Sequence, residues 1–468
     1  MVLLLPKLFG TSGVRGVFPE RMNPELMVRV GRAIAQYFNR SPFSVGHDAR
    51  TSSKALSFAL ISSLISSGAS VVDLGLTPIG VLAWSIKRFN LGGGIYVTAS
   101  HNPPQYNGFK VFKKGGVEVT TIDEVGIEEA LDRAGYATWS EVGSYSNFSP
   151  IEDYINELES LLSVPYVKYK PRVVLDTANG PTVLVAPKVL TDIGASTLVI
   201  NGNIDGRFPS RYPEPRPDVL EPLFPVLSAV GCDALFAFDG DGDRLSVVTP
   251  SRGFIKQDRV IALFAHRILS ERKGVVVASV DCGNAVRRVV ENSGGKLVLY
   301  KLGKTHEGFL KYGNTVLAAE PWKVIDPRWG LWIDGVYQAA YLTKLMMEEG
   351  KSMEQILNYI PDFPQARVSI VVPENLKTDI YWEVAEAMKS RHSEKAEITE
   401  IDGLRIDFED SSWILIRPSG TEPKIRLYAE AMDLEGLKSL VDSVLSLLLR
   451  SLSARGVEPQ SIERSILP

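Results

Sequence analysis

The chain is poor in the features on which several protein classes depend. Its 468 residues include two cysteines, Cys232 and Cys282, too few for a disulfide scaffold or a zinc cluster. Lys and Arg number 51 against 55 Asp and Glu, and without a basic excess neither nucleic acid nor a membrane surface is an expected partner. No apolar run approaches the roughly 18–20 residues of a membrane span, and the opening MVLLLPKLFG is shorter than a signal-peptide core. We therefore expect a globular protein of the cytoplasm.

What the sequence does contain is an alternation of strand-like and helix-like segments. The runs GGGIYVTAS, PRVVLDTANG and GVVVASVDCGN are apolar and end in polar loops, and helical patterns follow the second and third. This alternation predicts α/β units with mostly parallel sheets. Because the passages recur at wide spacing, we expect repeated α/β domains, and one large sheet is less favoured for a chain of this length.

Clusters of Pro, Ser and Gly near residues 147–154, 249–259 and 360–370 mark candidate boundaries. We expect domains at residues 1–150, 151–252, 253–364 and 365–468. The last differs in kind, because SWILIRPSGTEPKIRLYAEA reads as two strands around a polar loop and LEGLKSLVDSVLSLLLRSL as a helix. It predicts a smaller α+β domain, with the tail after Arg455 loosely held.

An acidic loop is the strongest chemical signal. In FAFDGDGDRLSVV, Asp239, Asp241 and Asp243 alternate with glycines between two apolar runs. Crowded carboxylates repel one another, and a hard divalent cation neutralises them. A helix–loop–helix calcium site would need Gly and Glu where Arg244 and Pro250 stand. Mg²⁺ with an outside ligand remains, in preference to a solvated hairpin turn, and Arg244 adds positive charge toward an anionic group.

The stretch TASHNPPQYNGFK holds Ser100, His101 and Asn102 ahead of two prolines, which end the preceding strand. Ser100 lacks the Gly-x-Ser-x-Gly surroundings of a hydrolase nucleophile. Alone, this serine could equally cap an Asn-Pro turn. Beside a metal loop, a serine that carries a phosphoryl group becomes the favoured interpretation, with Lys110 as a donor to the group in transit.

Two glycine-bearing loops have the composition of phosphate cradles, although alone each could be a simple basic turn. The candidates in RPSGTEPKIR are Arg417, Ser419, Gly420, Thr421, Lys424 and Arg426. Those in FGTSGVRGVF are Thr11, Ser12, Gly13 and Arg15. The turn VGHDART, with His47, Asp48 and Arg50, is predicted to have a structural role.

Two further segments are candidates for substrate binding. Gly303 and Lys304 begin GKTHEG, and Glu320 follows an apolar run, as a carboxylate that binds sugar hydroxyls would. For Trp322, Trp329 and Trp332 the core interpretation is favoured over ring stacking.

Taken together, these motifs resemble those of the α-D-phosphohexomutase family of bacterial and archaeal phosphoglucomutase, phosphomannomutase and phosphoglucosamine mutase enzymes. The resemblance covers nearly the whole chain and rests on FGTSGVRG, TASHNPPQYNGFK, DGDGDR and RPSGTEPKIR, in the family's order. It implies three related α/β domains with mixed sheets and a smaller α+β C-terminal domain around a central cleft.

The resemblance also implies a role for each motif. Ser100 would carry the phosphoryl group and bind Mg²⁺ together with Asp239, Asp241 and Asp243. Arg15, His101 and Lys110 would lie by the transferring group, and Arg244 with the sugar-loop residues would contact the substrate. The phosphate that does not react would be held by Arg417, Ser419, Gly420, Thr421 and Arg426.

One loop departs from the family. Its sugar loop usually reads Gly-Glu-x-Ser-Gly-His, and here AEPWKV keeps Glu320 but places Trp322 at the Ser and Val324 at the His. Lys323 is a candidate replacement contact. The departure leaves the sugar preference open.

The implied activity is interconversion of hexose 1-phosphate and hexose 6-phosphate, of glucose or mannose, through phospho-Ser100 and a bound 1,6-bisphosphate activator. The substrate would be a small sugar phosphate and the protein a monomer or homodimer. A phosphoglucosamine mutase, a phosphatase and a non-catalytic sugar-phosphate sensor stay open as alternatives.

Overall fold

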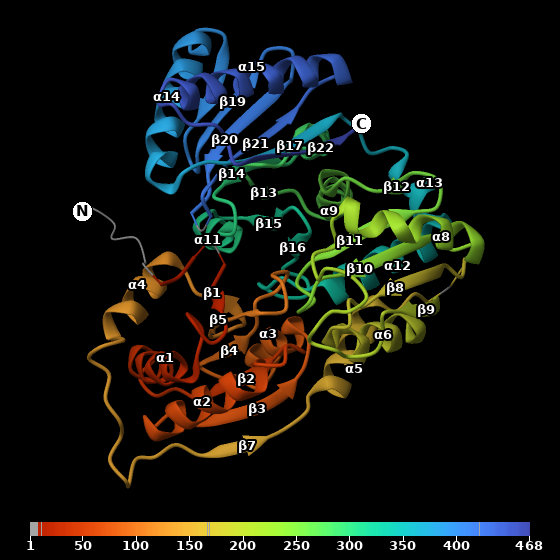
Figure 1. Ribbon diagram of the computed structural model, residues 1–468. Coiled ribbons are helices and arrows are strands. Elements are labelled where there is room, and N and C mark those ends of the chain that lie inside the picture. Colours follow the sequence, from red (N-terminus) through yellow and green to blue (C-terminus); the bar gives the residue numbers. More distant parts are fainter. Residues whose placement is uncertain (1–7, 11, 166, 168, 421) are drawn as a thin grey trace. The chain divides into compact units, whose positions relative to one another are not determined.

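The computed structural model describes residues 8–10, 12–165, 167, 169–420 and 422–468. The chain forms two compact units: Met1–Ile255 with Trp322–Asn358, and Lys256–Pro321 with Tyr359–Pro468. Figure 1 shows helices and strands alternating along most of the chain, as the sequence predicts.

The N-terminal sheet of the first unit has the strand order β1-β5-β4-β2-β3-β7, with β6 paired to β5. Strands β2, β3, β4 and β7 run parallel, and β5 and β1 continue the sheet antiparallel. The strands are β1 (Val14–Val17), β2 (Phe43–His47), β3 (Val71–Leu76), β4 (Gly93–Val97), β5 (Tyr106–Lys113), β6 (Val117–Glu118) and β7 (Tyr145–Asn147). The helices are α1 (Pro24–Tyr37), α2 (Ser53–Ser66), α3 (Ile79–Arg88), α4 (Thr121–Ala130) and α5 (Ile151–Leu162).

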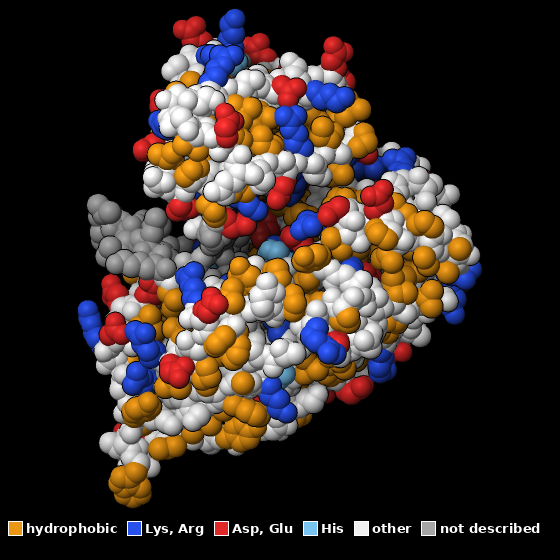
Figure 2. Space-filling model, in the orientation of Figure 1, with side chains coloured by type: hydrophobic (Ala, Val, Ile, Leu, Met, Phe, Trp, Pro, Cys, Tyr) orange, Lys and Arg blue, Asp and Glu red, His pale blue; other side chains and the backbone are white. Residues whose placement is uncertain are grey.

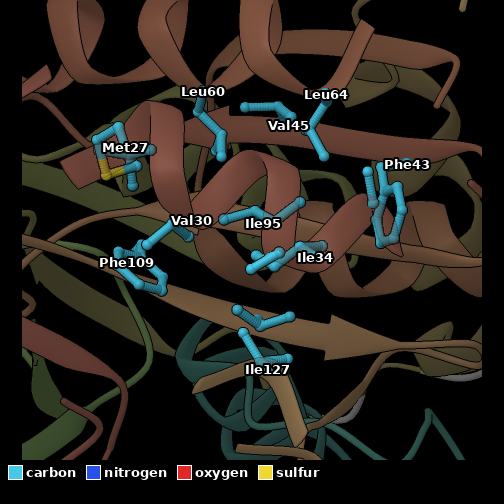
Figure 3. Close-up of a cluster of buried hydrophobic side chains, with 14 of the residues drawn as sticks. Met27, Val30, Ile34, Phe43, Val45, Leu60, Leu64, Ile95, Phe109 and Ile127 are labelled. Atoms are coloured by element: carbon cyan, nitrogen blue, oxygen red, sulfur yellow. The ribbon is translucent and has the colours of Figure 1, made fainter. Parts of the chain in front are cut away.

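Helix α1 begins where the sequence provides a cap, since the Asn23 side chain accepts from Leu26 N at 3.0 Å and Pro24 follows it. Apolar side chains of α1 and α2 cover one face of the sheet, and Figure 3 shows them converging with residues of the strands. The labelled side chains are Met27, Val30, Ile34, Phe43, Val45, Leu60, Leu64, Ile95, Phe109 and Ile127.

The opposite face of this sheet carries small residues, which let α3 approach closely. A Cβ on Gly94 would lie 2.7 Å from Ile86 Cδ1, and one on Gly46 would lie 3.2 Å from Leu82 Cδ1. Because strand side chains alternate between faces, large residues at 43, 45 and 95 and small ones at 46 and 94 fix the two sides of the layer.

The second sheet of this unit has the order β12-β11-β10-β8-β9. Strands β8, β9 and β10 are parallel, and β10, β11 and β12 are antiparallel. The strands are β8 (Arg172–Asp176), β9 (Ser196–Ile200), β10 (Ala234–Phe238), β11 (Leu245–Thr249) and β12 (Gly253–Phe254). The helical segments are η1 (Pro181–Leu184), α6 (Ala186–Asp192), α7 (Pro217–Leu220), η2 (Glu221–Leu223) and α8 (Phe224–Val230). Strand β16 (Lys323–Ile325) and helices α12 (Gly335–Glu349) and α13 (Met353–Leu357) complete the unit.

The two sheets of the first unit share a topology. Each has parallel strands followed by an antiparallel hairpin, formed by β4 and β5 in one sheet and by β10 and β11 in the other. The serine loop is the turn of the first hairpin and the acidic loop is the turn of the second. The expectation of repeated α/β units is therefore met at the level of strand order, with mixed rather than mostly parallel sheets.

The second unit begins with parallel strands in the order β14-β13-β15. These are β13 (Val275–Ser279), β14 (Lys296–Tyr300) and β15 (Thr315–Glu320), accompanied by α9 (Gln257–Glu271), α10 (Asn284–Asn292) and α11 (Thr305–Lys311).

The C-terminal sheet is antiparallel throughout, in the order β18-β19-β20-β21-β17-β22. Its strands are β17 (Gln365–Val371), β18 (Ala396–Thr399), β19 (Leu404–Phe408), β20 (Trp413–Pro418), β21 (Lys424–Glu430) and β22 (Ser461–Leu467). Helices α14 (Glu374–His392) and α15 (Leu434–Ser453) bury their apolar side chains against it. The expected fold class, α/β layers followed by an α+β C-terminal domain, is confirmed.

The expectation of a loosely held tail after Arg455 is wrong. Residues 461–467 form β22, which pairs antiparallel with β17 from Gln365↔Leu467 to Val371↔Ser461. The partner strand of SIERSIL lies about ninety residues upstream, so the local sequence does not predict this pairing.

The surface agrees with the composition. Figure 2 shows Lys and Arg side chains interspersed with Asp and Glu over the face it draws. Among the described residues, no helix is long and apolar enough to span a bilayer.

Candidate active site

The serine loop connects β4 to β5 and holds Ser100 in a conformation that few residues other than glycine adopt. Ser100 has a φ of +50° and is completely buried. A left-handed conformation costs a residue with a side chain about 1–2 kcal/mol. The amide of Ser100 donates to Thr98 Oγ1 at 2.7 Å, so the side chain of a neighbour fixes the turn.

The acidic loop connects β10 to β11 and needs its glycine. Gly242 has a φ of +82°, and a Cβ there would lie 2.3 Å from Thr182 Cγ2. Asp239 Oδ1 accepts from the amides of Gly242 and Arg244 at 3.0 and 3.1 Å, which turns the loop back on itself. One ligand atom from each of Asp239, Asp241 and Asp243 lies within 4.8 Å of the others.

The structure brings the two loops together. Ser100 Oγ donates to Asp239 Oδ2 at 2.7 Å, across 139 residues of sequence. The main chains are also close, because a Cβ on Gly240 would lie 2.7 Å from the carbonyl oxygen of Ser100. A serine hydroxyl and three carboxylates therefore share one buried site within the first unit.

Two lysines form ion pairs with the acidic loop. Lys110 Nζ lies 2.5 Å from Asp243 Oδ2 and 3.4 Å from Asp241 Oδ2, and Lys323 Nζ lies 3.1 Å from Asp243 Oδ2. Lys110 reaches the loop from β5, where it pairs with Tyr96 of β4. Lys323 stands beside the acidic loop, which the sequence did not predict.

The pKa values of Asp239 and Asp243 are shifted in opposite directions. Burial, and then the Asp241 and Asp243 carboxylates, hold the pKa of Asp239 well above its usual value. Burial also raises the pKa of Asp243, but Lys110, Lys323 and Arg244 outweigh it and hold that pKa well below the usual range. The site thus holds three carboxylates against two lysines, which do not balance its negative charge.

The donor set fits a hard divalent cation. Among the described residues, the buried oxygens Asp241 Oδ1 and Asp243 Oδ1 have no hydrogen-bond donor. Leaving such oxygens unsatisfied is costly, and an all-oxygen set of carboxylates and a serine oxygen suits Mg²⁺.

Arg15 and His101 lie beside the serine. Nη1 of Arg15 donates to Asn102 Oδ1 at 2.9 Å and lies 3.4 Å from His101 Nδ1, which is itself 3.4 Å from Ser100 Oγ. Burial, followed by Arg244 and Arg15, lowers the pKa of His101 well below its usual value. The ring is therefore neutral at pH 7.

Arg244 and Trp322 lie next to each other in the same unit. The Arg244 guanidinium pairs with Glu214 at 2.6 Å and lies 5.3 Å from the centre of the Trp322 ring. The Trp322 indole donates to Ser246 Oγ at 3.0 Å. Trp329 and Trp332 are buried, as the core interpretation predicts, whereas Trp322 is only half-buried.

In the second unit, Glu320 and Gly303 come together. Glu320 Oε2 accepts from the Gly303 amide at 2.6 Å, at the end of β15. Lys304 lies next to Gly303, with Nζ 3.9 Å from Glu307 Oε1. These three predicted residues share one loop cluster.

The predicted phosphate loop is the turn between β20 and β21. Arg417 and Arg426 are cross-strand partners at its base. Arg417 pairs with Asp402 at 3.0 Å, and Arg426 pairs with Glu422. Ser419 and Gly420 form the turn, where a Cβ on Gly420 would meet nothing within 4 Å. Thr421 and, near the N-terminus, Thr11 lie outside the described residues.

Sequence reasoning missed Lys377, a buried side chain on α14. Its Nζ donates to the carbonyl oxygens of Ser419 and Glu422 at 2.8 and 3.0 Å, and so fixes the phosphate loop. A lysine about forty residues from the loop gives no motif, and only the packing of α14 on the sheet brings it there.

Comparisons with known proteins agree with these motifs. Four family models described as phosphoglucomutase/phosphomannomutase match the chain: α/β/α domain I at residues 6–137, domain II at 152–253, domain III at 256–363 and the C-terminal domain at 374–447.

Individual proteins are similar over most of their length. A phosphopentomutase of Thermococcus kodakarensis is 40% identical, over 91% of this chain and 94% of the relative. A probable phosphoglucosamine mutase of Methanopyrus kandleri is 35% identical, over 95% and 98%. A crystal structure of a phosphoglucomutase/phosphomannomutase family protein from Burkholderia thailandensis has a TM-score of 0.85 at 26% identity, over 97% of this chain and 99% of that one.

Proposed function

Because this chain belongs to the phosphoglucomutase/phosphomannomutase family, whose members are phosphate-transferring isomerases, we propose that it interconverts a hexose 1-phosphate and the hexose 6-phosphate. Glucose and mannose phosphates are the first substrates of this proposal. The observation that carries it is the 2.7 Å contact between Ser100 Oγ and Asp239 Oδ2 inside the buried acidic site.

The serine is the carrier of the phosphoryl group. In the first half-reaction, the bond between phosphorus and Ser100 Oγ breaks as a bond to the free sugar hydroxyl forms. The hydroxyl proton ends on Ser100 Oγ, and His101, 3.4 Å from that oxygen, is placed to pass it. The 1,6-bisphosphate returns its other phosphate to Ser100, and the hydroxyl proton of Ser100 passes to the sugar oxygen released in that step.

Positive side chains stabilise the charge that shifts during transfer. A phosphoserine carries about −1.5 to −2 charges at neutral pH, next to three carboxylates. Lys110, Arg15 and Arg244 supply fixed positive charge around it. Mg²⁺ held by the aspartates and Ser100 would add further positive charge at the phosphoryl oxygens.

The magnesium assignment has its own test. Asp241→Asn keeps the side-chain shape but removes a charged oxygen ligand. Loss of a residue that only hydrogen-bonds to a metal ligand typically weakens metal affinity by roughly 10–100-fold. Because Asp241 is itself a proposed ligand, we expect the Mg²⁺ concentration for half-maximal activity to rise by at least that factor. An unchanged magnesium titration would count against the acidic loop as the metal site.

The phosphate loop is assigned to the phosphate that does not react. Arg417 and Arg426, at the base of the open turn formed by Ser419 and Gly420, offer charged donors to an anion. Since the two half-reactions mirror each other, this loop must accept either end of the sugar, and hexose 1,6-bisphosphate is the expected activator.

A pentose phosphate is the second candidate substrate. The relative from T. kodakarensis, at 40% identity, is named a phosphopentomutase. In addition, Trp322 stands where the family's loop has a serine, and its indole donor is directed to Ser246. A bulky ring in place of a hydroxyl group suits a sugar with fewer hydroxyl groups.

A substrate panel decides between these candidates. The protein is assayed with Mg²⁺, the matching bisphosphate and the 1-phosphates of glucose, mannose, glucosamine and ribose. The proposal predicts the largest kcat/KM for glucose or mannose 1-phosphate, and a largest value for ribose 1-phosphate would replace it with the pentose candidate. Phosphate released as fast as isomer forms would indicate a phosphatase, and calorimetric binding without turnover would indicate a sensor.

A further inference from the structure

Arg50 makes a set of contacts to the serine loop that a simple polar turn does not require. Its side chain is fully buried, and all five guanidinium donors have acceptors. Nη2 donates to the carbonyl oxygens of Ser100 at 2.8 Å and Asn102 at 2.6 Å. Nη1 donates to those of Pro103 at 2.6 Å and Tyr106 at 3.0 Å. One side chain thus holds four carbonyl groups along the loop that carries Ser100.

The Asp48 carboxylate holds the Arg50 guanidinium in place. Arg50 Nε donates to Asp48 Oδ2 at 3.0 Å, and Asp48 is completely buried at the end of β2. The same oxygen accepts from the Thr98 hydroxyl at 2.7 Å, and Thr98 Oγ1 accepts from the amide of Ser100. Asp48 therefore orients both contacts that set the backbone of Ser100.

Phe208 packs next to both Arg50 and the acidic loop. The Phe208 ring lies 5.0 Å from Arg50 Cζ, and a Cβ on Gly240 would lie 3.2 Å from the same ring. Arg50 is thus packed between the serine loop and a residue that also touches the backbone of the acidic loop.

From these contacts we infer that Arg50 is a positioning residue for phosphoryl transfer, which holds the strained Ser100 so that its Oγ stays against Asp239. The inference rests on the proposed function for its kinetic consequence. A lysine cannot reproduce it, because an ammonium is a single point with three donors and lacks the planar fork of a guanidinium. A misplacement of about 1 Å costs on the order of 10²-fold in rate.

The test compares Arg50→Lys with wild-type protein by two measurements. Amide hydrogen exchange is followed in residues 98–106, and kcat and KM are measured with the preferred sugar 1-phosphate. We expect faster exchange in this segment, on the order of a 10²-fold fall in kcat and a KM within about two-fold of wild type. A residue that only stabilises the fold would accelerate exchange throughout the unit and leave kcat of the folded protein unchanged.

Arg405→Lys is the matched control, because Arg405 is also a buried arginine that donates to two carbonyl groups, of Val280 and Cys282, at 2.6 and 2.7 Å. It should leave exchange in residues 98–106 unchanged. Asp48→Asn, which keeps the side-chain shape, should give the Arg50→Lys effects in weaker form, and it serves if Arg50→Lys does not fold.

Two outcomes overturn the inference: exchange in residues 98–106 unchanged by Arg50→Lys and Asp48→Asn, or kcat unchanged although exchange is faster. If wild-type protein neither turns over a sugar phosphate nor phosphorylates Ser100, the proposed function fails instead. Hydrogen exchange then still decides whether Arg50 holds the loop.

Discussion

Lys110 is placed where a lysine is rarely found, with its ammonium group buried between Asp241 and Asp243. Burial lowers the pKa of Lys110, but the two carboxylates outweigh it and raise that pKa above the usual value. The side chain therefore stays charged and has two roles. It compensates the acidic loop in the folded protein, and in the proposed reaction it would offer a donor to a phosphoryl group on Ser100.

Lys110→Met removes both contributions. We expect kcat to fall by roughly 10²–10³-fold, as when one donor to the transition-state charge is lost. Without Mg²⁺, we also expect the free energy of unfolding to fall by about 3–5 kcal/mol, because two carboxylates lose a buried partner. Enzyme assays and urea titrations measure the two effects.

Lys113→Met provides the control on the same strand. Lys113 pairs with Asp123 at 2.9 Å and is partly exposed, so its loss should cost less than about 1 kcal/mol and leave kcat within two-fold. Equal effects of the two substitutions would contradict the special place given to Lys110.

At the residue scale, the sequence predicted what lies within a motif and missed what depends on distant partners. Ser100, Lys110 and the aspartates stand in short recognisable loops. Arg50 was predicted to have a structural role, but its partners, four carbonyl groups that begin fifty residues away, could not be predicted from its own motif. Lys323 was a candidate sugar contact in the AEPWKV loop, and its pairing with Asp243 of the acidic loop was not predicted. The order of the motifs cannot show such pairings.

At the scale of elements, local pattern predicted the strands that matter for the site. The runs expected as buried strands are β4, β8 and β13, and the two strands around RPSGTEPKIR are β20 and β21. Strand β22 was not predicted because six of its seven residues are exposed, and the sequence therefore shows no apolar face from which a strand could be predicted. Its stability comes from the ladder to β17, which is a tertiary property.

Deleting residues 459–468 tests that ladder. We expect the C-terminal part of the second unit to lose roughly 1–7 kcal/mol of unfolding free energy, since the ladder has seven cross-strand pairs and each contributes about 0.2–1 kcal/mol. Urea unfolding followed by Trp413 fluorescence, in a variant with the other tryptophans replaced by phenylalanine, reports on this sheet. An unchanged midpoint would mean that β22 adds nothing to it.

At the scale of the whole molecule, the two units differ in what they contribute. The first contains the complete constellation of Ser100 and the acidic loop, and the second contains the phosphate loop. The second unit also holds a buried acidic pair that joins α9 to β21. Asp258 and Glu430 both accept from Gln365 Nε2, the latter at 2.8 Å.

This pair predicts a pH dependence of stability. Burial, and then the Glu430 carboxylate, raise the pKa of Asp258 from 3.8 to about 7. The folded protein therefore binds more protons than the unfolded chain between these values, and the unfolding free energy of the second unit falls as pH rises from about 4 to about 7. The other charged or titratable groups around the pair are Asp281, Cys282, Arg367 and Arg405.

Asp258→Asn should flatten that dependence, because an amide keeps the hydrogen bonds without a titrating proton. Urea titrations at pH 5, 6, 7 and 8 measure it, with the exposed Asp379→Asn as control. A slope that is the same in Asp258→Asn and wild type would rule out Asp258 as its origin.

The central claim is that Ser100 carries the phosphoryl group in the site built with the acidic loop. The most direct measurement is peptide mapping by mass spectrometry after incubation with Mg²⁺ and a sugar bisphosphate, followed by a chase with sugar 1-phosphate. We predict one phosphoryl group on the peptide that contains Ser100, its loss during the chase, and no interconversion by Ser100→Ala. Near-normal interconversion by Ser100→Ala, or turnover with no phosphate on that peptide, would contradict the account.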